Sequence, residues 1–411
     1  MIILITMAPP IAKISQKIMK DQYNALVFRE GRGCVYLVGG YLRDILIGAR
    51  SNDRDYVFFG ESRTFVEGIQ KITGGTIVAF KKEDMFRIAL KGGGTLDFSR
   101  PQGSILEDLS GRDFTVNAIA WSPQSGVLDL FKGFDDINNR IVRCISRKNF
   151  IADPLRMLRT YRIAAELDAS IEERTRLIIK RLQNSIKKVP HERITLEFFK
   201  LLNSNRSAKY LKMALHDGIL SNILSINYRQ LERSIRAISH IEKAYINMLP
   251  RSIKVLLNRS ISQDITYKGL LCLEMMLKDS SANDWPRHGL NLSNFVRKRL
   301  QSAGKGINKL KKIGYRKETL FDAFMNAGES SIDSLIILNK LDILRDYYRF
   351  RRVWKKGFLS SREISDIAGI KDGPKLGSII LMIKKAQFTG KLKTRRQAER
   401  FVRIIGQQKT L

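Results

Sequence analysis

Two aspartates, two positions apart, are the residues of this sequence best suited to do chemistry. Asp53 and Asp55 stand in the segment DRDYVF, whose apolar end is typical of a β-strand. Alternate residues of a strand point to one face of the sheet, so the two carboxylates lie side by side and repel each other. Mg²⁺ prefers such oxygen ligands, and it can clamp the attacking and leaving oxygens of a phosphoryl transfer. The pair therefore indicates a magnesium site, with a solvated turn as the alternative.

A glycine pair, Gly39–Gly40, lies shortly before the acids, between a predicted strand (CVYLV) and a short helical pattern that ends at Gly48. Such a pair lets backbone N–H groups approach a phosphate, and the helix N-terminus that follows favours an anion. Arg43, on the first helical turn, carries the forked guanidinium that suits a triphosphate. Asp97, on the later predicted strand GTLDFSR, is a candidate third carboxylate. A glycine pair alone is more typical of a plain turn, but this order of elements favours a nucleotide site.

The elements around these residues predict a mixed α/β domain of roughly 110 residues. We expect helices over 11–30 and 62–73, and strands over 75–80, 85–92 and 94–100. After about residue 143, amphipathic helical patterns continue to the C-terminus, broken only by short polar loops. Because the chain has 411 residues, we expect more than one domain.

The net charge of +33 is distributed unevenly. Up to residue 150 there are 21 basic and 16 acidic residues, and the remainder holds 52 basic and 24 acidic residues. A long basic surface of this kind suits the backbone of RNA or DNA, with a merely solubilising surface as the alternative.

Three cysteines, Cys34, Cys144 and Cys272, lie far apart and form no CxxC motif, which favours a reducing, cytoplasmic setting over a disulfide framework. The apolar start MIILITMAPP is too short for a membrane span, so we expect no membrane anchor, and Met7 is an alternative start to Met1.

The segment LVGGYLRDILIGARSNDRDYVF (37–58) resembles the first signature of the class II tRNA nucleotidyltransferase and bacterial poly(A) polymerase family. The resemblance implies the α+β class: a polymerase-beta-like nucleotidyltransferase head followed by all-helical parts. The implied domains are an N-terminal helix (1–30), the head (31–143), a neck for base recognition (144–205), an RNA-binding body (206–340) and a basic, tRNA-binding tail (341–411).

Two further segments resemble motifs of this family. EDLSGRDFTVNAIAW resembles the second motif, in which Arg112 and Asp113 would contact the ribose, although Gly111 stands where the family usually has another arginine. DLFKGFDDINNRIVR (129–143) resembles the third motif, which links head and neck and is thought to act as a hinge.

ADPLRMLRTYR resembles the fourth motif, with Asp153, Arg156, Arg159 and Arg162 at three-residue spacing on one predicted helix. In the family, the aspartate and the first arginine bind the Watson–Crick edge of the incoming base, a role that suits their donors and acceptors. Ala152 replaces a glutamate that is frequent there. A surface arginine stripe is the alternative for this helix taken alone.

HERITLEFFKLL resembles the fifth motif, in which Arg193 and Glu197 would brace the neck helices. The doublet His216–Asp217 is the only trace of a phosphohydrolase motif, and we interpret it as a helix end.

The resemblance implies addition of CMP and AMP, from CTP and ATP, to the 3′ acceptor end of tRNA, with Mg²⁺ as cofactor. The implied catalytic residues are Asp53, Asp55 and Asp97, of which Asp53 and Asp55 hold the metal. The implied nucleotide-binding residues are Gly39, Gly40, Arg43, Arg112, Asp113, Asp153, Arg156, Arg159 and Arg162.

Alternatives within the family are CC-only addition, A-only addition and poly(A) tailing. The compact stretch from Asp55 to Arg112 favours CC-only addition, because a loop used to switch from C to A is short, and the basic charge favours poly(A) tailing. An RNA-binding protein without catalysis is the alternative of another class. The oligomeric state does not follow from the sequence.

Overall fold

The computed structural model describes residues 9–80, 85–101, 103–247, 249–262, 264–278, 289–312 and 316–407. The chain forms two compact units, one running up to Glu232 and including Gly289 and Leu290, the other starting at Arg233. The alternative starts, Met1 and Met7, lie outside the described residues. Within the described residues, none of the helices has both the length and the apolar character that a bilayer span requires.

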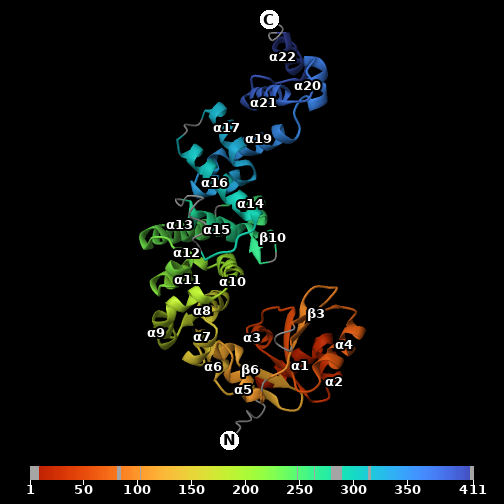
Figure 1. Ribbon diagram of the computed structural model, residues 1–411, viewed down its shortest axis with the longest axis vertical. Helices are drawn as coiled ribbons and strands as arrows, with labels where there is room; N and C mark the ends of the chain where they lie inside the picture. The colour runs from red at the N-terminus through yellow and green to blue at the C-terminus, as the bar shows by residue number, and fades with distance from the viewer. Residues whose placement is uncertain are drawn as a thin grey trace. The chain divides into compact units, whose positions relative to one another are not determined.

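The head is built on one seven-stranded sheet in the order β3-β4-β5-β2-β1-β6-β7 (Figure 1). Its strands are β1 (Val35–Val38), β2 (Asp53–Phe58), β3 (Thr76–Phe80), β4 (Met85–Ala89), β5 (Thr95–Ser99), β6 (Ile119–Ser122) and β7 (Gly126–Asp129). β2 runs parallel to β5 and antiparallel to β1, so Asp55 lies between Val38 and Asp97 in the sheet. The five strands expected from the sequence are confirmed, and β6 and β7 extend the sheet beyond β1.

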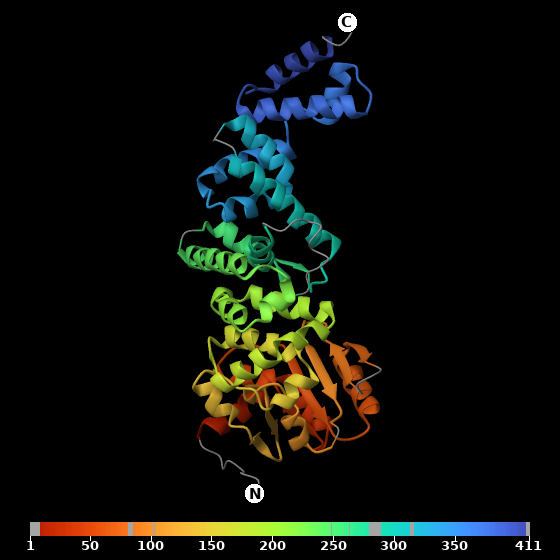
Figure 2. The same ribbon diagram turned by 60° about the vertical axis from the view of Figure 1, so that its left-hand side comes forward.

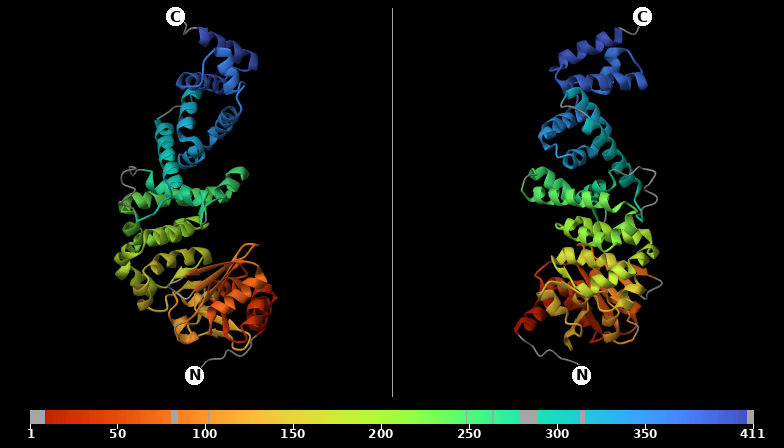
Figure 3. Two further views of the ribbon diagram at one scale, coloured as in Figure 1. Left: turned by 45° about the vertical axis from the view of Figure 1, so that its right-hand side comes forward. Right: turned by 90° about the vertical axis from the view of Figure 1, so that its left-hand side faces the viewer.

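Helices cover both faces of this sheet. They are α1 (Pro9–Lys20), α2 (Gln22–Glu30), α3 (Gly40–Leu46), α4 (Ser62–Thr73), α5 (Ile105–Ser110) and α6 (Gly133–Asn138), with a 3₁₀ turn at Thr115–Asn117. The red and orange helices α1, α2 and α4 lie on one face (Figure 3). On the other face, Val57 packs in a core with Leu109 and Leu128.

The single helix expected over 11–30 is wrong in one respect, because Asp21 divides it. Asp21 has extended backbone angles, and its carboxylate accepts hydrogen bonds from the backbone N–H groups of Tyr23 and Asn24, each at 3.0 Å. This is the arrangement of an N-cap, so α2 begins as a new helix.

Helices follow one another from residue 147 to the end of the first unit (Figure 2). They are α7 (Arg147–Ala152), α8 (Leu155–Leu167), α9 (Glu173–Leu182), a 3₁₀ helix (Gln183–Lys188), α10 (His191–Asn203), α11 (Ser207–His216) and α12 (Ile219–Leu224), with the two-residue strands β8 (Ile141–Val142) and β9 (Ser170–Ile171). α8 packs against both α10 and α11. An α/β head with a helical remainder confirms the expected fold class.

In the described residues of the second unit, the short hairpin β10 (Ser260–Ser262) and β11 (Ile265–Thr266) accompanies the helices, and the sequence pattern did not predict it. Its helices are α13 (Tyr228–Asn247, which starts in the first unit), α14 (Arg251–Asn258), α15 (Tyr267–Leu277), α16 (Asn294–Lys312), α17 (Lys317–Ala327), α18 (Ser331–Ile337), α19 (Leu344–Lys355), α20 (Ser361–Ala368), α21 (Pro374–Thr389) and α22 (Arg395–Gln407), with 3₁₀ turns at Gly328–Ser330 and Leu341–Ile343. One core joins α14 to α19 and includes Phe324 and Phe350. A second joins α20, α21 and α22 around Ile379 and Val402.

Candidate active site

The glycine turn at the start of α3 lies against two of the predicted site residues. Gly39 has φ 76° and ψ −142°, a conformation that side chains disfavour. A Cβ atom on Gly39 would stand 3.0 Å from Nη1 of Arg112 and 3.2 Å from Oδ2 of Asp55. The backbone angle therefore favours glycine, a side chain here would be tightly placed, and the turn, the acid strand and the second motif meet at this point.

The two aspartates of β2 differ in their surroundings. Asp53 is exposed and accepts a hydrogen bond from Oγ1 of Thr95 at 3.2 Å. Asp55 is more enclosed, and burial, aided by the charges of Asp97 and Asp53, raises its pKa to about 6 against the opposing effect of Arg112. A carboxylate that is enclosed among other carboxylates is stabilised by a cation. The pair therefore fits a hard divalent metal such as Mg²⁺.

Asp97 lies beside Asp55 in the sheet but already has a partner. Nε and Nη2 of Arg87, on β4, donate to its two carboxylate oxygens at 2.7 and 2.5 Å. Among the described residues no group of three or more acidic, histidine or cysteine side chains forms a metal cluster. The role of Asp97 as a third carboxylate stays a prediction. Arg87 was missed in the sequence, and its only signal is the register that places it opposite Asp97.

Arg43 is buried and folds back over the glycine turn. Its Nε and Nη2 donate to Oδ1 of Asp44 at 3.0 and 2.8 Å, and its Nη1 donates to Oδ1 of Asn117 at 2.9 Å. A Cβ atom on Gly40 would lie 3.5 Å from its Nη2. Arg43 thus joins the turn to Asn117 of the second motif, and its contact with a triphosphate stays a prediction.

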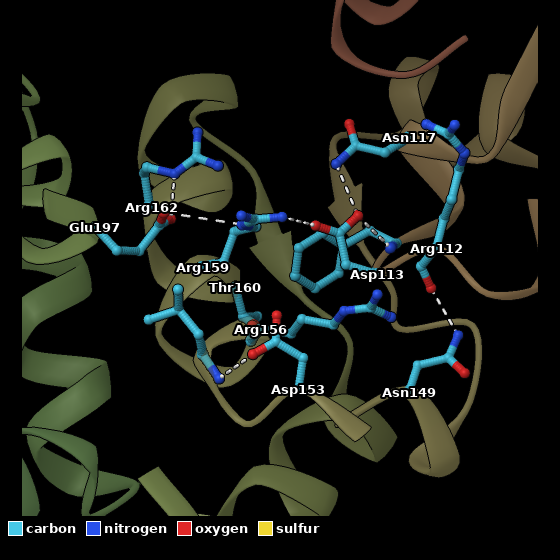
Figure 4. A network of polar contacts seen from close by, with 12 residues as sticks. Arg112, Asp113, Asn117, Asn149, Asp153, Arg156, Arg159, Thr160, Arg162 and Glu197 are labelled. Atoms are coloured by element: carbon cyan, nitrogen blue, oxygen red, sulfur yellow. Dashed lines mark hydrogen bonds and ion pairs between the residues drawn. The ribbon is translucent and has the colours of Figure 1, made fainter. Parts of the chain in front are cut away.

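The arginine and aspartate of the second motif have separate partners (Figure 4). Arg112 donates from Nε to Oδ2 of Asp108 at 2.9 Å. Asp113 is buried and accepts hydrogen bonds from Asn117 at 3.0 Å and from Arg159 at 3.1 Å. Burial favours the neutral form of Asp113, but the charge of Arg159 and these hydrogen bonds outweigh it and lower the pKa. Asp113 is therefore a fixed anion between the head and α8.

Asp153 does not lie on the arginine helix, so that part of the sequence prediction is wrong. Pro154 follows it, and a residue before proline is biased to an extended conformation, here φ −135° and ψ 94°. Its Oδ1 accepts from the backbone N–H of Leu155 at 3.3 Å, and its Oδ2 accepts from Arg193 at 2.9 Å. Asp153 thus stands just before α8, held by the fifth motif.

The three arginines of α8 have different surroundings (Figure 4). Nη1 of Arg156 donates to the backbone carbonyl of Gly111 at 2.7 Å, so this arginine reaches the second motif. Arg162 donates to Glu197 on α10, and Nε of Arg159 lies 3.8 Å from the same carboxylate. Burial opposes the charge of Arg162, but Glu197 and a second glutamate raise its pKa. Arg162 therefore holds α8 to α10, and its predicted contact with a nucleotide stays a prediction.

The doublet His216–Asp217 is a helix end, as the sequence predicted. α11 ends at His216, whose imidazole is largely exposed. Asp217 is buried and accepts two hydrogen bonds from Arg176, at 2.9 and 2.7 Å, and one from the Tyr161 hydroxyl at 2.9 Å. Its carboxylate is therefore saturated by structural partners.

Known proteins resemble both the head and the whole chain. The model of the poly A polymerase head domain matches residues 35–143, and that of the probable RNA and SrmB-binding site of polymerase A matches residues 169–227. A CC-adding tRNA nucleotidyltransferase of Synechocystis is 27% identical over 90% of this chain and 93% of its own. Another, of Geobacter sulfurreducens, is 26% identical over 92% of this chain and 93% of its own.

Among solved structures, the Thermotoga maritima CCA-adding enzyme complexed with tRNA shares the fold, with a TM-score of 0.73 and 20% identity over 95% of this chain and 97% of that one. The five sequence motifs lie on the head and the helices after it. The glycine turn lies against the acid strand and the second motif, and the second motif contacts the arginine helix α8. Models of two parts of polymerase A thus match residues 35–143 and 169–227 of this chain, and the chain is similar over 90% or more of its length to tRNA nucleotidyltransferases.

Proposed function

We propose that this protein adds CMP and AMP, from CTP and ATP, to the 3′ end of tRNA without a nucleic-acid template. The observation that carries the proposal is the close approach of Asp55 and Arg112 to the glycine turn, where a Cβ atom on Gly39 would stand 3.2 and 3.0 Å from their side-chain ends. The whole-length relatives named above are tRNA nucleotidyltransferases, which supports tRNA as the substrate.

In the proposed reaction, the 3′-hydroxyl oxygen of the RNA attacks the α-phosphorus of the nucleotide, and the hydroxyl proton passes to solvent water. The bond from that phosphorus to the bridging oxygen breaks, and pyrophosphate leaves with the electron pair. The backbone N–H groups of the Gly39–Gly40 turn bind the triphosphate, because the absence of a side chain on Gly39 lets it come close. Arg112, beside the turn, supplies a fixed positive charge for the negative charge that develops.

Asp53 and Asp55 would hold Mg²⁺, which supplies positive charge for the attacking and leaving oxygens when it is bound. The raised pKa of Asp55, about 6, supports this role, since burial beside two further carboxylates makes its anion costly without a cation. At neutral pH the carboxyl is nevertheless ionised and ready to bind.

Base selection falls to Asp153 and Arg156. An aspartate accepts and an arginine donates, so together they match one hydrogen-bonding edge of a base and reject others. Arg193 orients Asp153, and the carbonyl of Gly111 orients Arg156, which ties base recognition in the neck to the second motif of the head.

Addition of two cytidines only is a second candidate. The observation in its favour is that two relatives that match 90% or more of this chain are CC-adding enzymes. The compact stretch between Asp55 and Arg112 points the same way. The cytoplasm is the compartment that suits either activity, because tRNA ends are the substrate of both.

The test uses transcripts of one tRNA that end before the CCA triplet, after its first C or after its second C. Each is incubated with Mg²⁺ and labelled CTP, ATP or both, and the products are resolved at single-nucleotide length. Full addition extends all three transcripts to CCA. Addition that stops after the second cytidine selects the second candidate, and a long adenosine ladder selects poly(A) tailing.

Asp55→Asn serves as the matched control, since asparagine has nearly the shape of aspartate but no charge. We expect it to lose addition while keeping the tRNA affinity of the unaltered protein. Absence of addition by the unaltered protein on every transcript, with tRNA still bound, would leave an RNA-binding protein without catalysis.

A further inference from the structure

The face of β2 opposite the aspartates carries a buried arginine. Arg54 lies between Asp53 and Asp55 in the sequence, so its side chain points to the opposite face of the sheet, the face on which α1, α2 and α4 lie. It is 6% exposed. A guanidinium in a core costs several kcal/mol unless it is paired and hydrogen-bonded. The groups that contact its guanidinium therefore indicate which parts of the fold the buried Arg54 holds together.

Arg54 is held on every side. Its Nε donates to Oδ1 of Asp21 at 3.0 Å, its Nη2 donates to the other oxygen of Asp21, and its Nη1 donates to the carbonyl of Asn52 at 2.9 Å. The guanidinium carbon lies 5.1 Å from the ring centroid of Tyr23 and 5.2 Å from that of Tyr41. Both distances are those of cation–π contacts. The side chain is thus fixed by a two-pronged ion pair and two aromatic rings.

One of these rings belongs to the glycine turn. Tyr41 directly follows Gly40, and its hydroxyl donates to Oδ2 of Asp21 at 3.3 Å and accepts from Nδ2 of Asn24 at 3.3 Å. Asn24 in turn accepts from the hydroxyl of Tyr56 at 2.5 Å, and Tyr56 is the next residue of β2 that faces this side. The N-cap and first turn of α2 therefore contact both the start of α3 and the acid strand.

We propose that Asp21, Arg54 and Tyr41 are positioning residues that fix the acid-bearing end of β2 relative to the glycine turn. The proposal rests on the proposed function, because it assigns to the start of α2 a part in aligning the two halves of that site. This helix precedes the segment that matches the poly A polymerase head domain, residues 35–143.

The geometry favours alignment over simple stability. Hydrogen bonds of the sheet fix the main chains of β1 and β2, whereas α3 leaves the sheet after Val38. Its start is tied to Asn117 by Arg43 and to the carbonyl of Ile119 by the N–H of Gly39, but neither of these contacts reaches β2. Arg54 supplies a link to β2, because its guanidinium contacts Tyr41 and it lies on the strand between the two acids. Misplacement of reacting groups by about 1 Å can lower a rate by about 10²-fold.

The test compares Arg54→Met, Arg54→Lys and Tyr41→Phe with Ser15→Ala as the matched control. Ser15 accepts from the indole N–H of Trp121 at 3.1 Å and so pins α1 to β6, away from the acid strand. kcat and KM for CTP are measured on tRNA that lacks its CCA end, at a temperature where circular dichroism shows every variant folded. We expect Arg54→Met to lower kcat about 10- to 100-fold with tRNA affinity unchanged, and Arg54→Lys to recover part of the loss. Ser15→Ala keeps the unaltered kcat.

Hydrogen exchange of the free protein gives a second measurement that needs no activity. Arg54→Met and Tyr41→Phe are each expected to speed exchange both in residues 37–41 and in residues 53–56, whereas Ser15→Ala changes neither segment. An unaltered kcat in folded Arg54→Met, or faster exchange in one segment alone, would overturn the proposal. If Arg54→Met does not fold, Tyr41→Phe decides by both measurements. Failure of the unaltered protein to extend any tRNA would refute the proposed function instead. The hydrogen-exchange measurement would then still test whether Arg54 and Tyr41 fix the turn relative to the acid strand.

Discussion

Replacing Asp55 by asparagine is expected to abolish nucleotide addition and, at the same time, to stabilise the metal-free head. Burial and the neighbouring carboxylates raise the pKa of Asp55 from 3.8 to about 6. Folding therefore disfavours its charged form, and asparagine carries no charge to disfavour. The substitution removes a metal ligand and an electrostatic cost together.

The size of the effect depends on pH in a defined direction. Between about pH 4 and pH 6 the unfolded carboxyl ionises while the folded one keeps its proton, so the free energy of unfolding falls as pH rises. Above about pH 6 the carboxyl is ionised in both the folded and the unfolded protein, and the electrostatic cost of folding stays constant. The raised pKa of Asp55 corresponds to a loss of about 3 kcal/mol at most in the free energy of unfolding. Because the side chain is partly exposed and solvent screens its charge, we expect a loss of about 1 to 3 kcal/mol. In a unit of this size that is a rise of a few degrees in Tm.

Thermal melting in EDTA at about pH 4.5 and about pH 8 measures the difference. Asp55→Asn should melt above the unaltered protein at the higher pH and by clearly less at the lower pH. Asp53→Asn is the matched control, because this exposed neighbour should lose activity with a smaller gain in Tm. Added Mg²⁺ should raise the Tm of the unaltered protein and leave that of Asp55→Asn in place. The reasoning fails if Asp55→Asn melts no higher at the upper pH, or gains equally at both.

Three further predictions concern the rest of the chain. Burial, with the charge of Asp333 beside it, raises the pKa of Glu274 well above its ordinary value, so stability should fall as pH rises from that ordinary value to the folded pKa. Glu274→Gln should flatten this slope in urea unfolding measured from acidic to alkaline pH. Asp217→Ala leaves Arg176 without its ion pair and should cost about 2 to 3 kcal/mol in urea unfolding, whereas His216→Ala should change neither stability nor nucleotide addition. The basic chain should lose about 10³-fold or more in tRNA affinity between low and moderate salt, measured by filter binding, and a flat salt response would contradict a phosphate interface.

Local patterns in the sequence predicted the strands that carry the site but not the whole sheet. The alternation of β2 and the glycine pair before it are signals within a few residues, and the structure reproduces them. β6 and β7 escaped prediction because the four residues of β6, Ile119–Ser122, are all buried and show no alternation. The break at Asp21 escaped for a related reason, since an aspartate inside a helical pattern is also a possible surface residue.

Contacts between distant residues explain the remaining differences. Arg43 was expected to face a phosphate, but its nearest oxygens include one from Asn117, which lies 74 positions away. Arg54 was not singled out in the sequence, and its partner Asp21 lies 33 positions away. No periodicity or spacing encodes such pairs, because the fold alone decides which charged side chains meet.

The arrangement of charge in the head answers why so basic a chain keeps two carboxylates side by side. Each arginine around the glycine turn already has a carboxylate of its own. These pairs are Arg43–Asp44, Arg87–Asp97 and Arg112–Asp108. Among the described residues, Asp53 and Asp55 form no ion pair with an arginine or lysine. The head thus pairs these three arginines with acids of its own, and it leaves the charges of Asp53 and Asp55 to be neutralised by a bound cation. A cation that arrives with a nucleoside triphosphate meets that need, since the triphosphate is itself an anion that binds the same ion, and each partner should therefore strengthen the binding of the other.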